Sequence, residues 1–125
     1  MAYRVTEEMK TYDGSCHCGA VAFSFRSPEI KSGRRCNCSV CIRKGAVMSV
    51  EYFRPEAFLT LTGKDSLAVY RFGDRMVNHY FCKRCGIYPF HDAVEKPGFL
   101  RINLGCVSGL DPLALDISLI NGKDF

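Results

Sequence analysis

The eight cysteines of this 125-residue chain constrain its fold more than any other feature. They occur in four groups: Cys16-His17-Cys18, Cys36-Asn37-Cys38-Ser39-Val40-Cys41, Cys82-Lys83-Arg84-Cys85 and the isolated Cys106. Closely spaced cysteines form disulfides or bind a metal. The first ten residues lack the apolar run of a secretory signal, so we expect a cytoplasmic protein with reduced thiols. Metal binding is therefore favoured over disulfides.

Zinc chemistry suggests how the cysteines are divided. Zinc takes four protein ligands in structural sites, and three plus an exchangeable ligand in catalytic sites. The middle group supplies three cysteines within six residues, and the two flanking groups supply two each. This division predicts two zinc ions, the second not necessarily filled in every molecule. Their ligands are Cys16, Cys18, Cys82 and Cys85 for the closed site, and Cys36, Cys38 and Cys41 for the open one.

Two other divisions remain open. Cys106 could complete the middle triad, which would make both sites structural, or a single zinc could bind while the other thiols stay free. Cys106 lies in an apolar segment, where a lone cysteine more often packs as a small hydrophobe. Of the histidines, His17 lies between two ligands and is expected to point away. His79 is expected to be structural, and His91 is the one to test near a site.

A C-x-C unit in a regular strand would point its two sulfurs to opposite faces. Both such units are therefore expected to lie in turns, which Asn37 and Ser39 would help to shape in the middle group. Four basic residues flank that group: Arg34, Arg35, Arg43 and Lys44. They either offset the charge of three thiolates and attract an anionic thiol, or are ordinary solvated surface charges.

The remaining sequence predicts an all-β fold with little helix. Short apolar runs rich in strand formers alternate with Gly, Pro and Asp; they cover residues 20–25, 46–53, 57–62, 67–72, 75–81, 99–104 and 113–120. Gly73-Asp74 predicts a hairpin between two of them, and one helical turn is expected near Pro55-Glu56-Ala57. No linker or repeat interrupts the chain, which predicts a single domain over residues 1–125.

The charge and hydropathy of the chain limit its partners. Its formal charge is +4 with neutral thiols. Seven metal-bound thiolates subtract seven charges and two Zn²⁺ add four, which leaves +1. The basic excess therefore compensates thiolate charge, and no nucleic-acid partner is expected. No run reaches the roughly 18 apolar residues of a membrane span, so no membrane association is expected.

Three motifs resemble those of the glutathione-dependent formaldehyde-activating enzyme family, which includes centromere protein V-like proteins. They are Gly14-Ser15-Cys16-His17-Cys18-Gly19, Cys36-Asn37-Cys38-Ser39-Val40-Cys41 and Phe81-Cys82-Lys83-Arg84-Cys85-Gly86. The motifs occur in the family's order, and the resemblance covers about residues 12–125, nearly the whole chain.

The resemblance implies a β-tent fold of packed antiparallel sheets. It also implies a structural zinc at the four flanking cysteines and a catalytic zinc at Cys36, Cys38 and Cys41. The family's activity joins glutathione to formaldehyde, a carbon–sulfur lyase reaction, so a small thiol and an aldehyde are the expected partners. Two other functions stay open: a non-catalytic zinc module that binds a protein partner, and a thiol-based metal or redox sensor.

Overall fold

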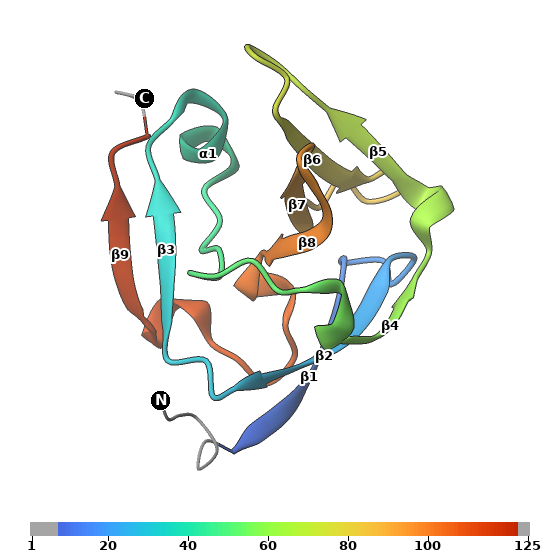
Figure 1. Cartoon of the computed structure of the whole chain (residues 1–125), viewed down its shortest axis with the longest axis vertical. Coiled ribbons are helices and arrows are strands. Elements are labelled where there is room, and N and C mark those ends of the chain that lie inside the picture. Colours follow the sequence, from blue (N-terminus) through green and yellow to red (C-terminus); the bar gives the residue numbers. More distant parts are fainter. Residues whose placement is uncertain (1–7, 123–125) are drawn as a thin grey trace.

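A computed structural model describes residues 8–122, which form nine strands in three sheets (Figure 1). The first sheet is antiparallel and contains β1 (Met9–Ser15), β2 (Ala22–Pro28) and β4 (Phe58–Thr62). The second pairs β3 (Ser32–Cys36) with β9 (Asp116–Ile120). The third is antiparallel, in the order β5 (Leu67–Tyr70), β6 (Val77–Cys82), β7 (Phe90–Ala93), β8 (Lys96–Ile102).

Helix is scarce in the described residues. The α-helix α1 (Ser39–Lys44) lies between β3 and the four-stranded sheet in Figure 1. Short 3-10 turns occupy Pro55–Ala57, Lys64–Ser66, Leu104–Cys106 and Pro112–Ala114. The mostly antiparallel β fold with little helix and the helical turn at residues 55–57 are thus confirmed. The sequence analysis did not predict α1.

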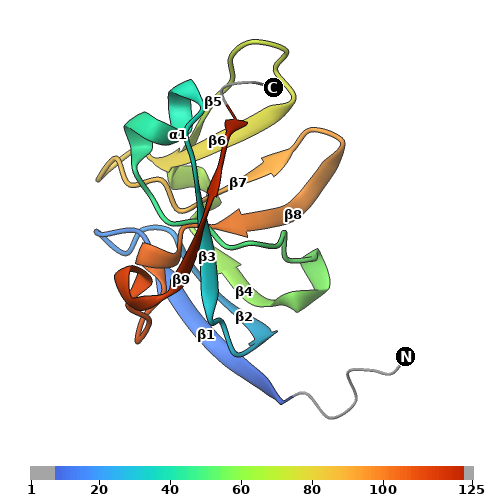
Figure 2. The ribbon, with the colours of Figure 1, turned by 90° about the vertical axis from the view of Figure 1, so that its left-hand side faces the viewer.

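Two sequence expectations need correction. Residues 46–53 do not form a strand: Met48 makes isolated bridges to Arg34 and Asn103, and Phe53 makes one to Leu100. This segment crosses between sheets, and single bridges satisfy its backbone without a continuous ladder. The two-stranded sheet is parallel, with Cys36 opposite Ile120 (Figure 2).

The core lies where the first and third sheets meet. Phe25 and Ile102 are fully buried, and Phe23 and Phe90 are 2% exposed. The rings of Phe23 on β2 and Phe90 on β7 meet edge to face at 5.9 Å, which joins the two sheets. Aromatic side chains bury large areas and dominate small cores. These Phe residues therefore belong to the core, whereas Tyr70 is 52% exposed.

The predicted hairpin forms between β5 and β6, where Leu67 pairs with Cys82 and Tyr70 with His79. Its loop is longer than the expected two residues because the ladder ends at Tyr70. Gly73 and Arg75 both have positive φ, at 59° and 61°, and turn the chain back toward β6. The hairpin places the end of β6, and with it Cys82, beside the turn that follows β1.

Candidate metal centre and adjoining cleft

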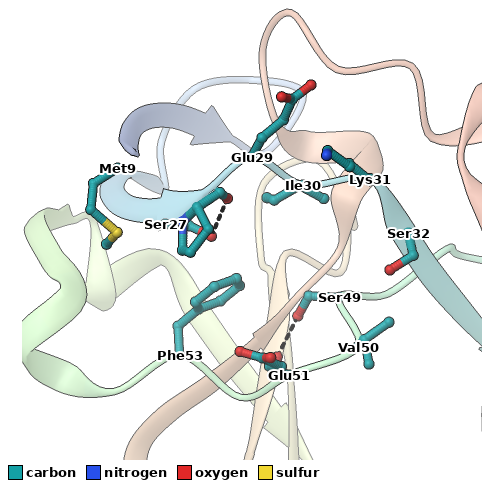
Figure 3. A pocket seen from close by; sticks show the side chains of 11 residues that line it. Met9, Ser27, Glu29, Ile30, Lys31, Ser32, Ser49, Val50, Glu51 and Phe53 are labelled. Carbon is teal, nitrogen blue, oxygen red and sulfur yellow. Dashed lines mark hydrogen bonds between the residues drawn. The ribbon is translucent and has the colours of Figure 1, made fainter. Parts of the chain in front are cut away.

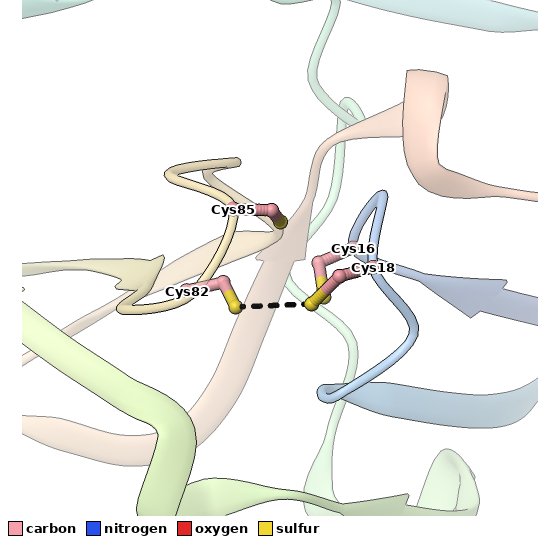
Figure 4. A group of neighbouring side chains, drawn as sticks. All are labelled: Cys16, Cys18, Cys82 and Cys85. Carbon is pink, nitrogen blue, oxygen red and sulfur yellow. Dashed lines mark hydrogen bonds between the residues drawn. The ribbon is translucent and has the colours of Figure 1, made fainter.

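Four sulfurs from distant parts of the sequence converge at one point (Figure 4). Cys16 and Cys18 come from the turn after β1, Cys82 ends β6 and Cys85 lies in the turn that follows. All four Sγ atoms lie within 4.8 Å of one another, and the Cys16–Cys18 and Cys18–Cys82 distances are both 3.7 Å. Sulfurs around a tetrahedral Zn²⁺ with bonds of about 2.3 Å are about 3.8 Å apart. The cluster therefore fits a zinc ion.

Backbone N–H groups around this cluster point at sulfur. Val21 N donates to Cys16 Sγ at 3.4 Å, and Arg84 N donates to Cys82 Sγ at 3.3 Å. The backbone N–H of Ile87 contributes most to lowering the pKa of Cys85 to about 6. Hydrogen bonds of this kind favour the thiolate, the form that binds metal.

The other candidate ligands lie outside this cluster. Burial, and then the charges on Cys16 and Cys85, raise the pKa of Cys106 to about 11, so Cys106 lies on the side of the four-cysteine cluster. Its sulfur is not among those that the middle triad brings together. His17 is exposed in the turn and belongs to neither group. All eight cysteines lie within the described residues, and none of them forms a disulfide.

The middle group forms a second, smaller cluster. Cys36 is the last residue of β3, Cys38 is the N-cap of α1 and Cys41 lies within α1, with their Sγ atoms within 4.8 Å of one another. Across residues 8–122, no fourth Cys, His, Asp or Glu joins them. The expectation that both C-x-C units lie in turns holds for Cys16 and Cys18. It is wrong for Cys36, because the strand runs up to this residue and the chain then bends directly into the helix.

The segment after β9 packs tightly against the triad. Asn37 N donates to the Ile120 carbonyl at 3.1 Å, and Gly122 follows two residues later. A Cβ on Gly122 would overlap Cys36 Sγ and would lie 3.3 Å from the Cys38 Cβ. Any larger residue here would have to displace the Cys36 sulfur, because the backbone at Gly122 lies directly against the triad.

A cleft of about 430 Å³ lies between α1 and the four-stranded sheet. It is largely apolar and aromatic, and its polar groups include a histidine, a lysine and tyrosines. Its lining consists of Val40, Lys44, Ala46, Tyr70, His79, Phe81, Gly86, Ile87, Tyr88 and Asn103. None of the triad cysteines is part of this lining, but Val40 and Lys44 lie on either side of Cys41 in α1, and the charges of Cys41 and Cys38 act on Tyr88. The cleft is therefore close to the triad.

A polar row crosses the sheet on the side that borders this cleft. Tyr70 pairs with His79, His79 with His91, and His91 with Arg101 in the antiparallel registers of β5 to β8. Residues paired in this way project from the same face of a sheet. His91 was singled out from the sequence, but the row as a whole was not predicted. Residues 77–81 (Val-Asn-His-Tyr-Phe) do not alternate between polar and apolar, so they carry no local signal for it.

The two histidines share one hydroxyl group. His79 Nδ1 lies 2.6 Å from Tyr88 Oη, and Tyr88 Oη lies 2.9 Å from His91 Nδ1. Burial, and then the charge of Lys44, lowers the pKa of His79 to about 4 and that of His91 to about 2. Burial raises the pKa of Tyr88, with the Cys41 charge acting in the same direction. All three side chains are therefore neutral at pH 7.

Two of the four predicted basic residues, Arg34 and Lys44, are partly buried, and the charge of Arg34 lowers the pKa of Arg101. Lys44 turns inward beside the cleft. Its Nζ is buried and lies 3.9 Å from the centre of the Tyr88 ring. Arg43 is exposed and donates to the Ser39 carbonyl at 2.8 Å, and Arg35 is also exposed. Arg101, which the sequence analysis did not single out, is 9% exposed and stacks over the Tyr52 ring at 4.2 Å.

A second cavity, of about 510 Å³, lies between the end of β2 and residues 49–53 (Figure 3). Two of its hydroxyl groups donate to nearby carbonyls: Ser27 donates to Pro28 O and Ser49 to Glu51 O, both at 2.7 Å. Its lining contains no cysteine or histidine. This cavity therefore offers neither a thiol nor an imidazole to a ligand.

The fold and site define a small, mostly β protein with one four-cysteine and one three-cysteine cluster, each able to hold a metal ion. The sequence profile of the family described as "Glutathione-dependent formaldehyde-activating enzyme" matches residues 11–119. The chain belongs to this family. No helix within residues 8–122 has the length and apolar character needed to cross a bilayer.

Two relatives agree with this assignment. A Halomonas elongata protein that carries the provisional name glutathione-dependent formaldehyde-activating enzyme is 27% identical over 107 residues. That alignment covers 67% of this chain and 66% of the relative, so the chain spans just under two thirds of its length. The crystal structure of a Rhodobacter sphaeroides protein superimposes with a TM-score of 0.71 at 32% identity, covering 85% of this chain and 99% of that one.

Proposed function

We propose that the chain is a zinc-dependent carbon–sulfur lyase that joins a small thiol, such as glutathione, to formaldehyde or another aldehyde. The main support is the triad of Cys36, Cys38 and Cys41, which has no fourth ligand of its own among the described residues and lies close to the 430 Å³ cleft. Family membership and the name of the Halomonas relative support the choice of glutathione and formaldehyde.

The two clusters would have different roles. In this proposal Cys16, Cys18, Cys82 and Cys85 hold a structural zinc, because four thiolates complete its coordination and Cys16 and Cys82 are part of the core. Cys36, Cys38 and Cys41 hold a catalytic zinc. We also propose that residues 1–125 act as one domain, and that the protein works in the cytoplasm, where thiols stay reduced.

The reaction is an addition: a sulfur–carbon bond forms, the carbonyl π bond breaks and the thiol proton ends on oxygen. A zinc ion at the triad would lower the pKa of the thiol and polarise the carbonyl. Lys44 and Arg101 would offset the negative charge of three thiolates. Neutral Tyr88 and His79 line the cleft and can exchange a proton through their 2.6 Å hydrogen bond. The apolar walls would limit the access of competing water.

Exchange NMR spectroscopy of ¹³C-formaldehyde and glutathione, with and without protein, tests this function. We expect the wild-type protein with two zinc ions per chain to accelerate the exchange between free formaldehyde and the adduct. Cys38→Ser should remove the acceleration while the fold is kept. Equal exchange rates with and without the wild-type protein, for glutathione and for other small thiols and aldehydes, would contradict the proposal. The non-catalytic zinc module or the sensor would then be favoured.

A further inference from the structure

Two buried side-chain nitrogens in the described part of the chain have no hydrogen-bond partner: Lys44 Nζ and Arg101 Nε. Both belong to cations. Buried polar groups are almost always paired, and a charged one left unpaired costs more than a neutral one. An acceptor beyond the surrounding protein groups, either a bound anion or an ordered water, is therefore expected at each of these nitrogens.

The surroundings of the two cations explain why no protein group serves as this hydrogen-bond acceptor. Lys44 has the Tyr88 ring at 3.9 Å, and Arg101 has the Tyr52 ring at 4.2 Å and the Val50 carbonyl 3.0 Å from Nη2. No carboxylate within residues 8–122 forms a salt bridge with either cation. The rings stabilise cations but cannot accept the missing hydrogen bonds in the way an anion can.

The triad sulfurs are the anionic groups that act on both cations. Charge on Cys41 and Cys36 opposes the lowering of pKa that burial causes in Lys44 and Arg101. Neither nitrogen is hydrogen-bonded to a sulfur. Three thiolates and a Zn²⁺ ion carry a net charge of −1, and the two cations bring the total to +1. The charge of Arg34, which also lowers the pKa of Arg101, adds to this total, so the centre has positive charge left for an anion to balance.

We propose that Lys44 and Arg101 form an anion-binding pair beside the triad, which takes one small monoanion at the open position. This inference rests on the proposed function and extends it: the thiol substrate binds as its thiolate, and inorganic monoanions compete for the same place. The two cations are positioning residues for that anion. Their pairing with aromatic rings keeps them in place when the anion is absent.

Titration of the Co²⁺-loaded protein with sodium thiocyanate at constant ionic strength tests the pair. The visible absorption of Co²⁺ at the triad reports binding, because the four-thiolate site has no position for another ligand. We expect saturable binding in the wild type, about tenfold weaker in Lys44→Gln and in Arg101→Gln, which corresponds to about 1.4 kcal/mol each. Arg43→Gln removes the same charge from the same helix but from an exposed side chain, and should change the Kd less than about twofold.

A neutral ligand shows whether a substitution changes the charge beside the metal or the access to it. Imidazole should bind the wild type and both variants with similar affinity, and raising the salt concentration should weaken thiocyanate binding but not imidazole binding. The proposal is overturned if thiocyanate does not bind the wild type, if its wild-type affinity is independent of salt, or if both Gln variants bind it as the wild type does. If a Gln variant does not fold, the salt dependence in the wild type decides.

These measurements need no turnover, so they are independent of the catalytic proposal. Anion binding that depends on Lys44 and Arg101, together with no reaction of any thiol and aldehyde, would uphold the pair and reject the lyase. Catalysis by the wild type, together with anion binding that neither Gln variant changes, would uphold the lyase and reject the anion-binding pair.

Discussion

His79 and His91 lie directly opposite each other on β6 and β7, and their Nδ1 atoms bond the same Tyr88 hydroxyl, at 2.6 and 2.9 Å. A hydroxyl has one proton to donate. It can therefore donate to one Nδ1 and must accept from the other. The two neutral rings consequently have opposite tautomers.

We expect ¹⁵N NMR spectra of the histidine rings to show one Nδ1–H and one Nε2–H tautomer for this pair between pH 8 and pH 5. Neither ring should become cationic in this range, because burial lowers the pKa of His79 to about 4 and that of His91 to about 2. Tyr88→Phe removes the shared hydroxyl and should abolish the opposite preference. Two identical tautomers in the wild type would contradict the hydrogen-bonding scheme.

The same pKa values predict how stability depends on pH. The folded pKa of each histidine is below the unfolded value of about 6.5, so the unfolded chain binds more protons below that pH. The stabilisation is complete above pH 6.5 and decreases as the pH falls toward 4. Urea unfolding at pH 7.5 and 5.5 should show a smaller loss of stability for His79→Gln than for the wild type. Protonation of the metal ligands lowers the stability of both proteins alike, so it cancels when their losses of stability are compared.

Gly122→Ala should release the metal from the triad without unfolding the protein. The added Cβ would overlap Cys36 Sγ, whereas the four-cysteine cluster is formed by other parts of the chain. Metal analysis should give one ion per chain in place of two, with intact circular dichroism. Gly45→Ala is the control: Gly45 has φ 69°, so the change adds backbone strain, but no atom lies within 4 Å of the new Cβ. Retention of both ions by Gly122→Ala would argue against this packing.

Removal of one ligand should affect the two clusters differently. Cys85→Ser leaves a three-sulfur site in the cluster that joins the ends of β1 and β6, and should unfold the domain, since structural zinc contributes on the order of 10 kcal/mol in small zinc domains. Cys38→Ser acts on a half-buried cluster beside α1 and should lower the melting temperature only slightly. Differential scanning calorimetry measures both. Equal destabilisation would refute the division into structural and catalytic sites.

Phe25→Ala should destabilise the protein by about 3–5 kcal/mol, because it empties a fully buried aromatic position. Its ring contacts Tyr12, Phe53 and Phe58 as well as Phe23. Urea unfolding of the metal-loaded protein gives the change in unfolding free energy. Leu113→Ala, at an 82% exposed position, should cost less than about 0.5 kcal/mol. A similar cost for both changes would contradict the placement of the core.

The spacing of the cysteines and the coordination number of zinc predicted the grouping that the structure has, but two other divisions stayed open, and the structure argues against one of them by placing Cys106 outside both clusters. The sequence also predicted most strands, since alternation and Gly-Asp or Pro-Gly punctuation are local signals. The segment 46–53 has the same composition but makes only isolated bridges. Its conformation depends on which partners the rest of the fold places beside it.

The polar row of the cleft depends on the register in which neighbouring strands pair. His79, His91 and Arg101 are separated in the sequence by 9 residues or more, and share a face only because β6, β7 and β8 pair as they do. A one-residue shift would send each to the other face. The α1 helix was not predicted from the sequence for a different reason. A six-residue helix has no apolar period to detect, and nearby tertiary contacts rather than intrinsic propensity stabilise it.

The parallel pairing of β3 with β9 makes the first triad sulfur depend on a segment about 80 residues further along the chain. Loss of β9 through proteolytic trimming, or its displacement by a bulky C-terminal fusion, would leave Cys36 without its neighbouring strand while the cluster at Cys16 and Cys82 kept its own supports. A preparation damaged in this way would still be a folded zinc protein by most assays. Metal stoichiometry is therefore a better measure of its integrity than its melting curve.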